Sequence, residues 1–102
     1  MKVQLFDDSL EKFIKSLEKP TIAKTLRTIE LLESFGERLG MPFSKKITSG
    51  IFELRVRGAQ EVRILFTFYK GSAMLLSGFV KKGRKTPRRE IDKALQRIRR
   101  FD

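Results

Sequence analysis

Cysteine and histidine are both absent from this sequence of 102 residues. Without cysteine there is no disulfide framework, no cysteine-based zinc site and no thiolate nucleophile. Without histidine, the commonest proton-transfer side chain is missing, and a transition-metal site would have to be built from carboxylates alone. We therefore expect no bound metal and no cofactor, and any catalysis must proceed without these two residue types.

Long hydrophobic runs are also absent. No segment approaches the roughly 18 apolar residues that a membrane-spanning helix needs. The N-terminal sequence MKVQLFDD contains no apolar signal region, so the sequence does not indicate secretion. The expectation is a protein of the cytoplasm that does not bind membranes.

Negative charge is scarce in the second part of the chain. Residues 1–40 contain seven Lys or Arg and seven Asp or Glu, whereas residues 41–102 contain sixteen basic and five acidic residues. The whole net charge of +11 therefore lies after residue 40, and ten of the basic residues lie between Lys81 and Arg100. A chain with one neutral and one strongly basic part is expected to present a face to RNA, DNA or an acidic protein.

The periodicity of the apolar residues predicts a single α+β domain over residues 1–102. A short edge strand is expected over residues 2–6, helices over 9–18 and 20–35, a short strand at 45–48, further strands over 52–57, 62–69 and 73–81, and a last helix from Pro87. A small, mostly antiparallel sheet of three or four strands should pack on an N-terminal helical hairpin, with the last helix at the C-terminus. The expected buried stripe of the second helix is Ile22, Leu26, Ile29, Leu32 and Phe35.

The two strands on either side of the loop at 58–60 can be aligned by pairing apolar with apolar residues. This register places Arg55 directly opposite Arg63, and both side chains then lie on the face of the sheet that does not carry the apolar pairs. Facing like charges are unfavourable in a free protein, whereas a phosphate site gains from them because guanidinium groups bind phosphate bidentately. The alternative is that both arginines are solvated on the outer face, with Glu53 and Glu61 as partners.

Further basic residues are expected around this face. The strand expected over residues 73–81 places either Lys81 or Lys82 opposite Glu61. The loop KKGRKT at 81–86 then leaves the sheet at the edge nearest Arg63. Lys45 and Lys46, which precede the hairpin, can reach the rim of the face that carries Arg55 and Arg63, although a lysine pair in a loop is usually ordinary surface. The candidates for binding a polyanion are Lys45, Lys46, Arg57, Lys81, Arg84, Lys85 and Arg88.

Four segments together resemble a known family. They are LLESFGERLGMPFSKK, IFELRV, VRILFTFYKG and LLSGFVKKGRKTPRREIDKAL, in this order and spacing. Over nearly its whole length the chain resembles toxins of the RelE/HigB superfamily of type II toxin–antitoxin systems, and it is most similar to the phage-derived HigB-like branch. The resemblance implies a RelE-like fold with the same order of strands and helices.

The resemblance also implies a ribosome-dependent endoribonuclease that cuts mRNA without a metal, by driving the 2′-hydroxyl onto the adjacent phosphate. The catalytic positions of the family correspond here to Glu53, Arg55, Arg63 and Lys82. The arginines would stabilise the charge on phosphorus, and Lys82, or less favourably Lys46, would transfer protons. Glu53 is a second candidate base. The implied partners are the ribosome, mRNA and a cognate antitoxin, often a helix-turn-helix protein.

The chain departs from its relatives at positions that often carry acid–base residues. Phe43 and Ser77 stand where many HigB relatives have histidine, and the single tyrosine is Tyr69, at a strand end rather than near the last helix. The identity of the acid and the base is therefore open. Two alternative functions also stay open: a ParE-like inhibitor of DNA gyrase, and an RNA- or DNA-binding module without catalysis.

Overall fold

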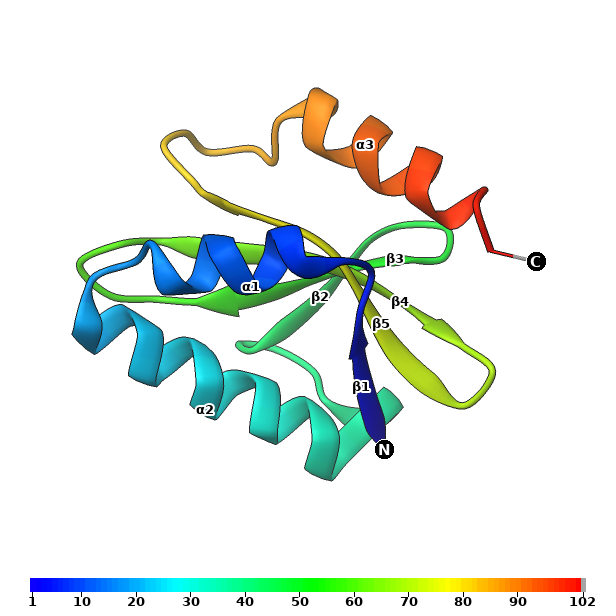
Figure 1. Ribbon diagram of the computed structural model, residues 1–102, viewed down its shortest axis with the longest axis horizontal. Coiled ribbons are helices and arrows are strands. Elements are labelled where there is room, and N and C mark those ends of the chain that lie inside the picture. The colour runs from blue at the N-terminus through cyan, green and yellow to red at the C-terminus, as the bar shows by residue number, and fades with distance from the viewer. Residues whose placement is uncertain (102) are drawn as a thin grey trace.

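The computed structural model describes residues 1–101, and its central feature is one β-sheet with helices on both faces (Figure 1). In chain order the elements are β1 (Lys2–Leu5), α1 (Asp8–Lys15), α2 (Lys19–Phe35), a short 3₁₀ helix (Gly36–Arg38), β2 (Ser44–Thr48), β3 (Ile51–Val56), β4 (Val62–Tyr69), β5 (Ser72–Val80) and α3 (Arg88–Ile98). None of the helices between residues 1 and 101 combines the length and the apolar character that a membrane crossing requires.

The sheet contains five strands in the order β1-β5-β4-β3-β2. β1 runs parallel to β5, and the other neighbouring pairs are antiparallel. The α+β class and the mostly antiparallel sheet are therefore confirmed, but the expected three or four strands were too few. The edge strand expected over residues 2–6 is present as β1 and joins the same sheet: it pairs with the outer edge of β5, and the long chain from α1 to β4 provides the crossover that a parallel neighbour needs.

The register of the central hairpin agrees with the pairing of apolar residues. Apolar side chains face one another along β3 and β4, and Arg55 lies opposite Arg63. At the end of β5, Lys81 rather than Lys82 lies opposite Glu61, because the N–H of Lys81 donates to the carbonyl oxygen of Glu61 at 2.7 Å. This register is strongly determined, since a slip by one residue would move every apolar side chain to the opposite face.

The two faces of the sheet carry separate apolar cores. On one face, α1 and α2 cover a core that includes Leu10, Leu32, Leu54, Ile64 and Phe66. On the other face, α3 packs over β4 and β5 around Ile51, Leu65, Leu76 and Ala94. Figure 1 shows α3 on the opposite side of the sheet from α2. Because α3 covers the β4–β5 side of its face, polar residues of β2 and β3 can gather beside it.

The buried face of α2 differs from the expected apolar stripe. Leu26 and Phe35 are about half exposed, at 50% and 49%, whereas Thr21, Thr25 and Thr28 are buried. The hydroxyl groups of Thr25 and Thr28 each donate to the carbonyl oxygen four residues earlier, at 2.8 Å. Because these hydroxyl groups are satisfied inside the helix, the threonines can be buried without an unpaired polar atom. The expectation for Leu26 and Phe35 was wrong for this reason.

Candidate functional site

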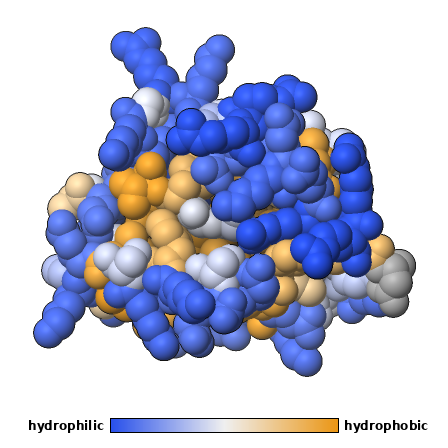
Figure 2. All heavy atoms as spheres, turned by 45° about the horizontal axis from the view of Figure 1, so that its top comes forward, coloured by the Kyte–Doolittle hydropathy of each residue, from blue (hydrophilic) through white to orange (hydrophobic). Residues whose placement is uncertain are grey.

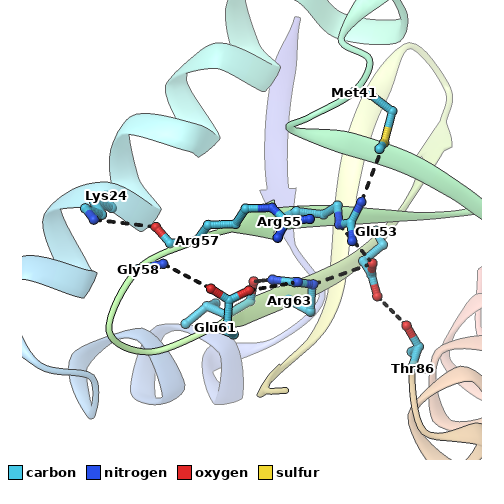
Figure 3. A network of polar contacts seen from close by, with 10 residues as sticks. Lys24, Met41, Glu53, Arg55, Arg57, Gly58, Glu61, Arg63 and Thr86 are labelled. Atoms are coloured by element: carbon cyan, nitrogen blue, oxygen red, sulfur yellow. Dashed lines mark hydrogen bonds and ion pairs between the residues drawn. The ribbon is translucent and has the colours of Figure 1, made fainter. Parts of the chain in front are cut away.

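Three charged side chains meet on the sheet face that carries α3. Strand alternation places Glu53 and Arg55 of β3 on the same face, and Arg63 of β4 lies opposite Arg55. The Oε1 atom of Glu53 lies 3.6 Å from Nε of Arg55 and 3.6 Å from Nε of Arg63. Figure 3 shows the carboxylate of Glu53 joined to both guanidinium groups. The two arginines therefore share one carboxylate.

Arg63 is enclosed by the protein, whereas Arg55 is not. The Arg63 side chain is 2% exposed, its Nη2 lies 3.1 Å from Oε1 of Glu61, and its Nη1 donates to the carbonyl oxygen of Val62 at 2.9 Å. The Arg55 side chain is 12% exposed, and its Nη1 donates at 3.6 Å to Sδ of Met41, which is a weak acceptor. The glutamate partners of the alternative interpretation are present, but Arg63 is buried rather than solvated. Arg55 is the arginine that a ligand can reach.

Thr86 connects the loop KKGRKT at residues 81–86, which we name the basic loop, to this group of charges. Its hydroxyl group donates a hydrogen bond to Oε2 of Glu53, a residue that is 2% exposed (Figure 3). The bond fixes the end of the loop to β3, just before Pro87 caps α3. From the sequence, Thr86 was expected only as the residue before a helix, and no pattern indicated its contact with Glu53.

The charges of this group, which we name the arginine–glutamate group (Glu53, Arg55, Glu61 and Arg63), are balanced. For Glu61, burial acts to raise the pKa, but the N–H of Gly58 and the guanidinium of Arg63 stabilise the carboxylate. The pKa of Glu61 therefore lies below its ordinary value of 4.5. With two carboxylates against two guanidinium groups, the positive potential of this face must come from neighbouring residues.

A cavity of about 300 Å³ opens onto Glu53 and Arg55. It is lined by residues of β2, β3, the basic loop and α3, namely Lys45, Ile47, Glu53, Arg55, Lys81, Arg84, Lys85, Thr86 and Ile91. Five of these residues are cations, and Glu53 is the single carboxylate among the described residues that line it. Figure 2 turns the α3 side of the molecule toward the viewer and shows hydrophilic side chains gathered around a hollowed, more apolar area. A polyanion that enters this basic cavity meets several cations at once.

The structure brings together only some of the expected site residues. The basic cavity contains Lys45, Glu53, Arg55, Lys81, Arg84 and Lys85. Lys82 is exposed on the loop outside the lining, and Lys46 projects to the opposite face of the sheet from Lys45 because the two are neighbours on β2. Arg57 lines a second cavity, and Arg88 is engaged in an ion pair within α3.

The arrangement at Arg55 is suited to a phosphate group. The Nε atoms of Arg55 and Arg63 are both shielded from solvent and make no hydrogen bond among residues 1–101, and each lies 3.6 Å from Oε1 of Glu53. Because 12% of the Arg55 side chain is exposed, a phosphate oxygen, which is a strong acceptor, can reach its guanidinium group. Over the same residues, no cluster of three or more acidic side chains is placed to hold a metal ion.

A comparison with protein families identifies the family of the chain. The family model described as "Phage derived protein Gp49-like (DUF891)" matches residues 12–99, a range that includes all the residues lining the basic cavity. The chain belongs to this Gp49-like family, which is part of the RelE/Gp49 group of toxins. No curated protein matches the chain. The toxin resemblance is thus confirmed at the level of the family.

Proposed function

We propose that this member of the Gp49-like family is the toxin of a HigB-like toxin–antitoxin pair, and that it is a ribosome-dependent endoribonuclease. The observation that carries the proposal is the basic cavity, where a partly exposed arginine lies beside a buried carboxylate and four further cations complete the charged lining. Such a site binds a phosphodiester and supplies positive charge where negative charge develops during cleavage.

The reaction is attack of a ribose 2′-oxygen on the adjacent phosphorus. A bond forms between the 2′-oxygen and phosphorus, the bond from phosphorus to the 5′-oxygen breaks, and the products carry a 2′,3′-cyclic phosphate and a 5′-hydroxyl group. Arg55 holds the non-bridging phosphate oxygens as their charge grows. The leaving 5′-oxygen takes a proton from an ammonium group of the lining, which contains Lys45, Lys81 and Lys85.

Glu53 has two roles in this proposal. It positions Arg55, because its Oε1 atom contacts that guanidinium at 3.6 Å. It is also the one carboxylate among the described residues that line the cavity, and so it is the acceptor for the proton of the 2′-hydroxyl group. Accepting this proton requires the contact between Glu53 and Thr86 to open, since that contact occupies Oε2. Placement of the RNA against Glu53 falls to the ribosome, which explains why isolated RNA should be a poor substrate.

The partners follow from the same cavity. The ribosome and mRNA present phosphates that the cations attract, and a cognate antitoxin, of the helix-turn-helix kind in the HigB-like branch, would mask these cations with acidic side chains. Co-purification with the product of an adjacent gene tests the antitoxin. Expression of the chain alone without growth arrest would count against a toxin.

The central experiment adds purified protein to ribosomes programmed with a defined mRNA and maps the cleavage positions. Arg55→Ala should lower the cleavage rate by about 10²–10³-fold, the usual effect of removing one group that stabilises developing charge. Arg38→Ala is the matched control, because Arg38 is exposed on the 3₁₀ helix away from the cavity. Lys45→Ala should weaken RNA binding and reduce its salt dependence, whereas Lys46→Ala on the opposite face should change both less.

The outcomes separate the candidate functions. If Arg55→Ala cuts mRNA at the normal rate, the basic cavity is not the active site. Intact mRNA together with inhibited DNA supercoiling would favour a gyrase inhibitor of the ParE type. RNA binding without cleavage, both on the ribosome and off it, would favour the third candidate, a nucleic-acid-binding module without catalysis.

A further inference from the structure

A second cavity, of about 290 Å³, lies between α2 and the end of β3. Its lining consists of Lys24, Arg27, Thr28, Leu31, Pro42, Phe43, Arg55, Val56 and Arg57. Lys24, Arg27 and Leu31 lie three and four residues apart, so they follow one flank of α2. Pro42 and Phe43 belong to the segment that leads into β2. This side cavity is distinct from the basic cavity, and the proposed reaction does not use it.

The chemistry of the side cavity is divided between an apolar interior and a basic rim. Leu31, Pro42, Phe43 and Val56 supply apolar surface, and the Phe43 side chain is 40% exposed. Four cations, Lys24, Arg27, Arg55 and Arg57, complete the lining, and no carboxylate is found among the described residues that form it. A flat aromatic group attached to negative charge fits both parts. An unpaired nucleotide has this combination, because each base has an aromatic face and each linkage carries a phosphate.

Arg55 connects the two cavities. It is the one described residue that lines both of them, and its backbone N–H donates to the carbonyl oxygen of Phe43 at 2.8 Å. Its guanidinium contacts Glu53 on one side and Met41 on the other, as Figure 3 shows. A phosphate bound to Arg55 would therefore lie between the basic cavity and the side cavity, which Phe43 also lines.

We infer that the side cavity binds the base of the nucleotide next to the scissile phosphate, stacked on Phe43, while Arg55 binds the phosphate between the two cavities. This inference rests on the proposed function, and it adds a subsite for a neighbouring nucleobase. The volume of about 290 Å³ lies at the lower end of the range for ligand pockets, and so suits a single base.

The shape of the apolar surface favours a base over a protein segment. A docked amphipathic helix needs apolar residues that continue along one side of its groove. On α2, the half-exposed Leu26 lies five residues before Leu31, which places the two about 140° apart around the helix axis. The apolar area at the side cavity is therefore short, and it ends at cations.

The test uses a tryptophan reporter and an RNA that cannot be cleaved. The chain contains no tryptophan, so Phe43→Trp introduces a single indole at the proposed stacking position. The ligand is a short single-stranded RNA with 2′-O-methyl groups, titrated at low salt. The control ligand is an abasic RNA of the same length, which lacks one base but keeps every phosphate. We expect the intact RNA to quench the indole fluorescence and the abasic RNA to leave it unchanged.

A binding cycle with Phe43→Leu gives the quantitative result. Loss of one stacked base weakens binding by about five- to hundredfold, so Phe43→Leu should weaken binding of the intact RNA by this factor. The abasic RNA should bind the unchanged protein with a similar loss, and Phe43→Leu should add little to it, because both changes remove the same contact. Leu26→Ala is the matched control, since Leu26 is a half-exposed apolar residue outside the lining. It should bind both RNAs as the unchanged protein does.

Three results would overturn the subsite. They are equal binding of intact and abasic RNA, additive losses in the cycle, or no RNA binding at low salt. Quenching by an acidic peptide, in the absence of quenching by RNA, would instead identify a protein-docking surface. Since no cleavage is measured, these results are independent of nuclease activity: equal binding of intact and abasic RNA, by a protein that still cuts mRNA on the ribosome, would refute the subsite and leave the proposed function intact.

Discussion

Replacing Arg63 by alanine should destabilise the protein far more than replacing Arg55, although the two arginines face each other across β3 and β4. Arg63 is 2% exposed and lies between the carboxylates of Glu53 and Glu61, at 3.6 and 3.1 Å. Its removal leaves Glu53, also 2% exposed, with Arg55 as its remaining cation at 3.6 Å. From the sequence both arginines were expected to act on the phosphate, and the structure gives them different surroundings.

The magnitude follows from the cost of leaving a buried charge without its partner. Breaking a buried ion pair by removing one member costs about 3–5 kcal/mol. For a domain of this size, a loss of about 3 kcal/mol lowers Tm by at least roughly 12 °C. It is also a large part of a total stability of about 5–15 kcal/mol. Arg55 contacts one carboxylate rather than two, 12% of its side chain is exposed, and its removal leaves Glu53 beside the buried Arg63, so Arg55→Ala should cost less, about 1–2 kcal/mol.

The assay is urea denaturation followed by circular dichroism, with Tm from calorimetry, on both single variants. A double variant, Glu53→Leu with Arg63→Met, replaces the buried charges by apolar groups and should recover most of the stability lost in Arg63→Ala. The same double variant should remain inactive toward mRNA, because it no longer positions Arg55. If Arg63→Ala unfolds within about 1 kcal/mol of Arg55→Ala, the assignment of Arg63 to the structural part of the site is refuted.

Two further predictions concern a glycine in the sheet and the acid stability of the hairpin. A Cβ atom on Gly78 would lie 2.6 Å from Cδ2 of Phe13, so Gly78→Ala should destabilise the protein by about 1–3 kcal/mol in urea denaturation. Gly83→Ala, with nothing within 4 Å, is the control and should change stability little; equal losses would contradict the clash. Because the pKa of Glu61 is lowered in the folded protein, its contribution is complete above pH 4.5 and is lost as the pH falls through that lower value. The stability difference between the unchanged protein and Glu61→Gln should therefore shrink with acidification below pH 4.5, and a constant difference in denaturation curves would contradict it.

The sequence was sufficient for the hairpin register but not for the buried face of α2. In β3 and β4, alternation has a period of two, and a wrong register would expose the whole apolar set, so Arg55 had to face Arg63. On α2, hydropathy ranks Leu26 above Thr25, yet Thr25 is fully buried and Leu26 is half exposed. The hydrogen bond from Thr25 to the carbonyl oxygen of Thr21 removes the cost of burying the hydroxyl, and a hydropathy pattern does not contain this bond.

The candidate site was predictable to the extent that it depends on strand geometry. Alternation places Glu53 and Arg55 on one face, and it separates Lys45 from Lys46, although the sequence offers both lysines equally. The burial of Glu53 was not predictable, because it depends on Thr86, which is 33 residues away in the chain and arrives with the loop that leads into α3. Contacts between a loop and a sheet have no periodic signal in the sequence.

The balanced charge of the arginine–glutamate group separates RNA attraction from chemistry. Because Glu53 and Glu61 offset the two arginines, the attraction comes from the other cations of the lining, which are Lys45, Lys81, Arg84 and Lys85. Attraction by such cations decreases as salt rises, because RNA binding releases counterions. A phosphate at the floor of the cavity competes with Glu53 for Arg55 alone, since Arg63 is enclosed. Loss of a rim cation should therefore alter affinity and its salt dependence, whereas loss of Arg55 should lower the cleavage rate even when RNA is saturating.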